Sequence, residues 1–159
     1  MKHIILTMGV MILSLSLISA AYAGTDMEGC NLTGASLKKC NLSGINLKNS
    51  TLRNVNFQEA NLSNTIFYLS ILHGTDFRNA NLKGANLSAC DLSDCNFSGA
   101  DLTGANLSGS NLQSANFKDA ILKGTDIDST VWSNVICPDG TLSNENGYSC
   151  GGHLSINKH

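Results

Sequence analysis

The sequence contains few charged residues, prolines and histidines. The small number of basic residues and histidines argues against several classes of function. Charged residues make up 14% of the 159 residues, with one proline and four histidines. The basic residues Lys38, Arg78 and Lys118 are too sparse for a nucleic-acid-binding surface. His73 and the other histidines after residue 23 are at no recognisable catalytic spacing from a nucleophile. We therefore expect no enzyme, no cofactor and no nucleic-acid partner.

Long hydrophobic runs are absent except at the N-terminus, where residues 4–18 are mostly apolar. Lys2 precedes this run and Ala21-Tyr22-Ala23 follows it, the pattern of a secretory signal peptide with a small-x-small cleavage site. A membrane anchor is the alternative, but the run is short for a span. We expect residues 1–23 to be a signal peptide cleaved after Ala23, which leaves a periplasmic or extracellular bacterial protein that is not inserted in a membrane.

A five-residue period is the dominant feature of the chain after that segment. From Leu32 to Trp132 a large apolar residue stands at every fifth position, in 21 consecutive units. We call this the central position; it is Leu in 14 units and Phe in five. A fixed short period predicts a repeat architecture.

Each unit has the same order of residue types. A small residue stands two places before the central position in nearly every unit, and Asn or Asp stands one place before it in 15 of 21 units. Two places after it, 15 of 21 residues are Gly, Asn or Asp. In an extended segment this order puts the small and central residues on one side and the Asn or Asp outside. The Gly, Asn or Asp then suits a turn that needs φ > 0, so each unit is predicted to be a short strand and a corner.

The phenylalanines set the number of units in a coil. Phe57, Phe77, Phe97 and Phe117 are 20 residues apart, the spacing at which four units per coil stack equivalent rings. Phe67 breaks this series and belongs to another side. The repeat over residues 24–134 then forms about 5.5 square coils, and the rod is about 26 Å long at the usual strand spacing.

This pattern resembles the pentapeptide-repeat family, A-(D/N)-L-x-x, as in Ala80-Asn81-Leu82-Lys83-Gly84 and Ala100-Asp101-Leu102-Thr103-Gly104. The resemblance implies an all-β fold, a right-handed quadrilateral β-helix with Leu, Phe and small residues inside. Some family members mimic DNA and act on gyrase, which makes a DNA-mimicking gyrase-interacting protein one alternative function. Those members are strongly acidic, whereas the processed chain would have nine basic and twelve acidic residues, a net charge of −3.

Six cysteines fall into two groups. Cys30, Cys40, Cys90 and Cys95 occupy the small position, which predicts buried thiols that act as small apolar residues. Cys90 and Cys95 lie on adjacent sides, so the sequence does not decide whether they are bonded.

Cys137 and Cys150 lie beyond the repeat, where an oxidising compartment favours a disulfide between them. We expect residues 135–159 to form a disulfide-stapled capping loop and tail that covers the last coil. The alternatives are a zinc site with His153, which lacks a fourth ligand, and a calcium site whose oxygen ligands do not match an EF-hand. The oxygen donors in that segment are Asp139, Asn144, Glu145 and Asn146. An envelope metal-binding or enzymatic protein that uses this loop is a second alternative function.

The repeat pattern fails most clearly between residues 65 and 73. Ile66 and Ile71 replace the outward Asn or Asp, and Tyr68 and Leu69 occupy the turn between them. An exposed apolar patch of this kind marks a partner-binding surface, although local repeat drift is the alternative. We expect a non-catalytic protein-interaction or structural module of the cell envelope that has an unknown protein partner and is a monomer or an end-to-end dimer.

Overall fold

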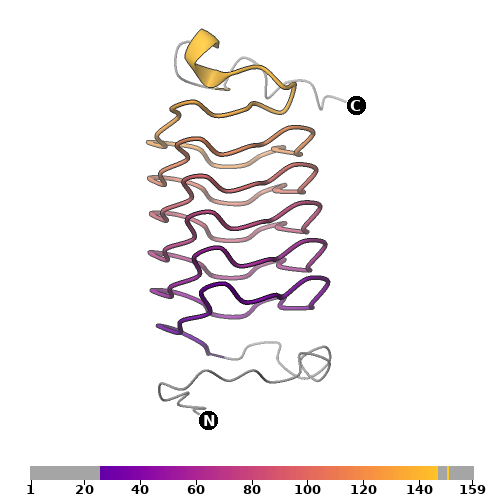
Figure 1. The fold of residues 1–159 in the computed structure, drawn as a ribbon, viewed down its shortest axis with the longest axis vertical. Helices are drawn as coiled ribbons and strands as arrows, with labels where there is room; N and C mark the ends of the chain where they lie inside the picture. Colours follow the sequence, from indigo (N-terminus) through magenta and orange to yellow (C-terminus); the bar gives the residue numbers. More distant parts are fainter. Residues whose placement is uncertain (1–25, 147–149, 151–159) are drawn as a thin grey trace.

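The computed structural model describes residues 26–146 and Cys150, and residues 26–136 coil into a rod (Figure 1). Nineteen parallel bridges each join a residue to the one 20 places later, from Asp26–Asn46 to Asn116–Ile136. Four bridges per coil make four short sides, so the fold is a quadrilateral β-helix. The signal-peptide prediction for residues 1–23 lies outside the described residues.

Backbone hydrogen bonds connect successive coils and close each corner. Leu82 N–H donates to Asp101 C=O at 2.8 Å, and Asp101 N–H donates to Ala80 C=O at 3.0 Å. Within a unit, Ala85 N–H donates to Leu82 C=O at 3.0 Å and closes a four-residue turn. The third residue of this turn, Gly84, has φ +64°, as a type II turn requires. We call the two central turn residues the first and second turn positions.

The core is a column of large side chains that point inward from all four sides. Phe57, Phe77, Phe97 and Phe117 stack with ring centroids 5.4, 4.9 and 4.7 Å apart. We call the side of the rod that bears them the Phe face. Phe67 comes from another side and meets Phe57 and Phe77 edge-on at 6.1 and 6.2 Å. All five rings are fully buried, which confirms the predicted inward orientation of the central position.

Most hydroxyl and thiol side chains at the small position donate a hydrogen bond to the preceding coil. The hydroxyl of Thr75 donates to Leu52 C=O, 23 residues earlier, at 2.7 Å. The thiol of Cys90 makes the equivalent contact with Phe67 C=O at 3.0 Å. Because these groups are satisfied inside the rod, a hydroxyl or thiol is tolerated where most units have Ala.

The repeat register continues to Ile136, two residues past the expected boundary at residue 134. Val135 and Cys137 are fully buried, and Cys137 takes the place of a central residue after Phe117 on the Phe face. The chain then reverses, with an antiparallel bridge between Ile136 and Leu142. The short 3₁₀ helix η2 (Ser143–Asn146) follows this reversal.

A disulfide joins Cys137 to Cys150, with a Cα–Cα distance of 5.5 Å. Trp132, the last large central residue, is almost fully buried and lies 5.8 Å from the Phe117 ring. The indole N–H of Trp132 donates to the hydroxyl of Thr130. An aromatic ring and a disulfide-linked reversal therefore lie at the C-terminal end of the described coils.

Candidate interaction surface

The structure exposes four apolar residues of segment 65–73, where the repeat pattern fails most clearly. Ile66, Tyr68, Leu69 and Ile71 have 36–47% of their surface accessible. Bridges from Ile66 to Asn46 and Asn86 hold the first of them in the regular ladder, so the backbone does not bulge here. The four side chains cover one corner of one coil, and we call this surface the apolar corner.

The isoleucines of the apolar corner replace a side chain that stabilises the turn. In regular units the outward Asn or Asp accepts a hydrogen bond from the backbone N–H of the first turn position, as Asn86 does from Ser88 at 3.1 Å. The hydroxyl of Ser88 adds a second bond to the same oxygen at 2.6 Å. Because isoleucine has no acceptor, Ile66 and Ile71 forgo a contact that the rest of the rod uses repeatedly.

Leu69 departs from the pattern in its backbone as well as its side chain. It occupies the second turn position with φ +61°, where 15 of the 21 units have Gly, Asn or Asp. Within the described part of the chain it is the only large apolar residue with positive φ. A branched side chain in this conformation is strained. Ile66, Ile71 and Leu69 each weaken the local structure, and all three lie at one corner. Local departures that cost stability cluster at functional sites, so we infer a functional role for this corner.

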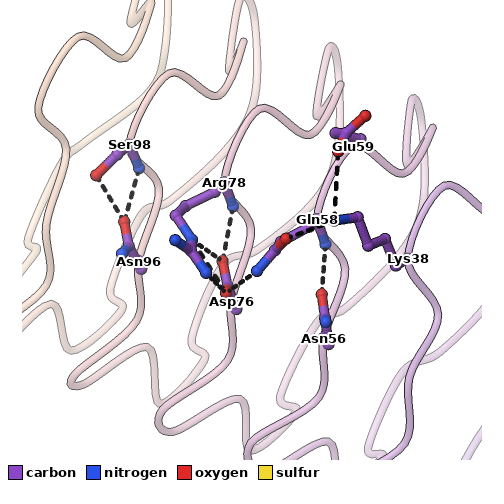
Figure 2. Close-up of polar contacts among 8 residues, drawn as sticks. All are labelled: Lys38, Asn56, Gln58, Glu59, Asp76, Arg78, Asn96 and Ser98. Atoms are coloured by element: carbon purple, nitrogen blue, oxygen red, sulfur yellow. Dashed lines mark hydrogen bonds and ion pairs between the residues drawn. The ribbon is translucent and has the colours of Figure 1, made fainter.

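The Phe face shows the opposite arrangement, because its polar side chains satisfy one another (Figure 2). Lys38 Nζ donates to Gln58 Oε1 at 3.0 Å, and Gln58 Nε2 donates to Asp76 Oδ2 at 2.7 Å. Arg78 holds the same carboxylate through Nε and a terminal guanidinium nitrogen, at 3.0 and 2.7 Å. Burial alone raises the pKa of Asp76, but the hydrogen bonds from Arg78 and Gln58 outweigh it and lower that pKa.

The histidine next to the apolar corner does not form a catalytic triad. His73 Nδ1 lies 2.9 Å from Ser93 Oγ and 3.5 Å from Asp94 Oδ2. Ser93 in turn has its hydroxyl 2.6 Å from Asp91 Oδ1. In a catalytic triad the serine and the carboxylate contact opposite nitrogens of the histidine ring, whereas here both lie near Nδ1 of His73. The cluster is therefore not arranged for nucleophilic hydrolysis.

The four cysteines of the repeat are free thiols. Desolvation by burial raises the pKa of Cys90 to about 12 and raises that of Cys95 as well. A thiol becomes a nucleophile only as the thiolate, so these two cysteines are unreactive near neutral pH. Cys30 and Cys40 are partly exposed, and burial raises their pKa too.

Neither sulfur of the Cys137–Cys150 disulfide is a thiolate ligand in this structure. His153, the third residue of the zinc alternative, lies outside the described residues. In the part of the chain that is described, no three His, Cys, Asp or Glu side chains are grouped to hold a metal ion. The same residues contain no helix long and apolar enough to cross a membrane.

Two family models match the sequence. A model of a pentapeptide repeat region matches residues 12–87, and a model of pentapeptide repeats matches residues 90–128 with eight copies. No curated protein matches the chain significantly.

Solved structures of pentapeptide-repeat proteins are similar to this chain. HetL from Nostoc sp. strain PCC 7120, described as involved in heterocyst differentiation regulation, is 27% identical with a TM-score of 0.44; the match covers 74% of this chain and 64% of HetL. The protein alr5209 from Nostoc PCC 7120 is 29% identical with a TM-score of 0.51, over 54% of this chain and 69% of its own.

QnrB1, described as a plasmid-mediated fluoroquinolone resistance protein, is 20% identical with a TM-score of 0.50. That match covers 70% of this chain and 57% of the QnrB1 chain. The chain thus spans less than two thirds of both HetL and QnrB1, and the likeness to QnrB1 shows the fold alone.

Proposed function

The chain belongs to the pentapeptide-repeat family, and from this premise we propose that it is a non-catalytic protein-interaction module exported to the cell envelope. The family fold is the right-handed quadrilateral β-helix, a rigid rod whose interior residues maintain the structure. Its outward positions are then available for recognition. The single observation that carries the proposal is the apolar corner.

The apolar corner supports binding because it combines exposure with rigidity. The backbone of Tyr68 accepts a hydrogen bond from Asn49 N–H at 3.0 Å, and Leu69 N–H donates to Ser88 C=O at 3.3 Å. Both turn residues are therefore tied to the neighbouring coils, and little backbone order is lost on binding. An aromatic residue flanked by aliphatic ones is a composition typical of binding hot spots.

Export is supported by the N-terminal sequence and by the cysteine chemistry. Residues 4–18 and the Ala21-Tyr22-Ala23 segment fit a cleaved signal peptide, and a structural disulfide persists in oxidising compartments. Mass spectrometry of the purified protein tests this proposal. We expect a chain that begins at Gly24 with two oxidised and four free cysteines, whereas an unprocessed chain in the cytoplasm would overturn export.

The C-terminal segment is proposed to cap the rod. Asn134 N–H donates to Asn144 Oδ1 at 3.0 Å, and Ser143 N–H donates to Val135 C=O at 2.8 Å. These contacts use backbone groups that another coil would otherwise pair. A cap covers the unpaired backbone edge of the last coil and so keeps it from pairing with other chains. The disulfide holds the C-terminal segment in place.

An affinity-capture experiment tests the binding proposal. The baits are residues 24–159 as wild type, an Ile66→Asn/Ile71→Asn double variant, and an Ile121→Asn control, each incubated with envelope and supernatant extracts. Ile121 is a matched control because it occupies an outward position on another face with 38% of its surface exposed. We expect a protein that is retained by wild type and by the control but lost from the double variant. Equal retention by all three baits would overturn the assignment of the site.

A gyrase-directed function has weaker support than the apolar corner. Its basis is a fold shared with QnrB1 at 20% identity, and the export signal separates this chain from gyrase. A supercoiling assay distinguishes the two functions: we expect neither protection nor inhibition of gyrase by the processed protein.

A further inference from the structure

Opposite charges lie on the two sides of the apolar corner along the axis of the rod. Backbone bridges place Thr51 before Ile71 and Asp91 after it in one column. The coil before Ile71 carries Lys48 and Arg53, and the coil after it carries Asp91 and Asp94. Taken coil by coil along the axis, this surface therefore carries cations, then the apolar corner, then anions.

Arg53 and Asp94 are exposed, whereas Lys48 and Asp91 are half-buried. Among the described residues, no ion pair joins either of these cations to either of these anions. Lys48 and Asp91 are two coils apart, about 10 Å at the usual strand spacing, with the apolar coil between them. Lys48 is instead 3.4 Å from the carboxylate of Glu28, in an exposed pair of the kind that contributes little stability. The side chain of Asp94 is 57% accessible, and Arg53 is exposed.

The order cation, apolar residue, anion is complementary to itself when it is reversed. A two-fold axis that lies in the interface at the level of Ile71, perpendicular to the rod, makes the second rod antiparallel to the first. The cationic coil of each copy then meets the anionic coil of the other, while the apolar corners meet in the middle. A parallel arrangement would place cation against cation, which is unfavourable.

We propose that the apolar corner binds a second copy of this chain, side by side and antiparallel, with Arg53 facing Asp94 and Lys48 facing Asp91 across the interface. The inference rests on the proposed function, because it takes the same surface as the binding site and names its partner. Because the proposed contact involves one corner of each rod, we expect it to bury less than the roughly 1,200 Å² of a stable interface. We therefore expect a weak dimer with a dissociation constant on the order of 100 µM.

Sedimentation velocity on the processed, disulfide-bonded protein from about 10 µM to 1 mM tests the proposal. Each charge reversal acts twice in a two-fold interface, so Arg53→Glu and Asp94→Arg should each weaken dimerisation about tenfold or more. The Arg53→Glu/Asp94→Arg double variant should restore it to within about threefold of wild type, because the charges are exchanged rather than lost. Lys123→Glu, a charge reversal at an exposed position outside the proposed interface, is the matched control and should leave the dimer unchanged.

Three results would overturn the inference. The protein could be a monomer at every concentration, the single charge reversals could leave the dimer unchanged, or the double variant could fail to restore dimerisation. Melting temperatures near wild type show that the variants are folded, and these surface substitutions break no core contact. A monomeric chain whose Ile66→Asn/Ile71→Asn variant still loses a captured protein would refute this inference and leave the proposed function intact. A monomeric chain with unchanged capture would refute both.

Discussion

The Phe face and the apolar corner are built from the same five-residue unit but use their outward positions in opposite ways. On the Phe face, Asn96 accepts hydrogen bonds from the backbone N–H and hydroxyl of Ser98 at 3.0 and 2.6 Å. At the corner, the side chains of Ile66 and Ile71 have no hydrogen-bond acceptor and expose apolar surface. The difference shows that the inward positions hold the rod together, so the outward positions can change without loss of the fold.

The largest effect that separates the two kinds of position is expected from Phe97→Ala. Phe97 is fully buried between the rings of Phe77 and Phe117. Its removal leaves a cavity in the middle of the rod and should lower the free energy of unfolding by about 3–5 kcal/mol. Urea denaturation measures this change. Asn96→Ser, one residue away and facing outward, should cost about 1 kcal/mol or less; equal losses would contradict the inward and outward assignment.

The disulfide should give the next largest effect. Cys150→Ser opens a loop with a sequence separation of 13 residues. In the chain-entropy model this lowers the free energy of unfolding by about 3 kcal/mol. Comparing wild-type protein with and without reductant provides the control, since both routes should converge on the same stability. An unchanged stability would show that the C-terminal segment contributes little to closing the rod.

A substitution at Leu69 is expected to have a smaller effect and to raise, rather than lower, the free energy of unfolding. Leu69→Asn relieves a branched side chain at φ +61° and should raise the free energy of unfolding by up to about 1 kcal/mol. The reverse change, Asn64→Leu at φ +56° in an equivalent turn, should lower it by about the same amount. Thermal denaturation of the two variants checks both signs. A loss of stability from Leu69→Asn would mean that the leucine side chain serves the fold.

The smallest effect concerns acid stability on the Phe face. The pKa of Asp76 is lowered in the folded state, so this carboxylate stabilises the fold above its unfolded pKa near 4. That contribution is lost as the pH falls through the folded pKa. Because the site is partly exposed, we expect less than about 1 kcal/mol. Denaturation of Asp76→Asn between about pH 2 and 6 should show a smaller acid-induced loss than wild type, and an identical pH profile would contradict the role of Asp76.

Periodicity alone predicted which residues face inward and which face outward. The 20-residue spacing of Phe57, Phe77 and Phe97 predicted the stack, and the pattern failure at residues 65–73 predicted an exposed apolar corner; the structure confirms the stack and exposes that corner. The ring stack and the exposed corner could both be predicted because the repeat reveals the number of residues per coil.

Contacts that depend on side-chain geometry were not predicted. The edge-on packing of Phe67 against Phe57 and Phe77 depends on how far rings reach across the core. The hydrogen bond from Thr75 to Leu52 C=O depends on rotamer choice 23 residues away. The opposite charges in the coils before and after Ile71 are present in the sequence, but their relation to the apolar corner required knowing which residues of each coil face outward.

The account's central claim is that Ile66 and Ile71 serve recognition rather than folding. The most direct test is the free energy of unfolding of the Ile66→Asn/Ile71→Asn double variant, measured by urea denaturation at a few micromolar protein. The account predicts a value within about 1 kcal/mol of wild type, because regained turn hydrogen bonds offset the lost apolar contact. A loss of about 3 kcal/mol or more, typical of core truncation, would contradict it.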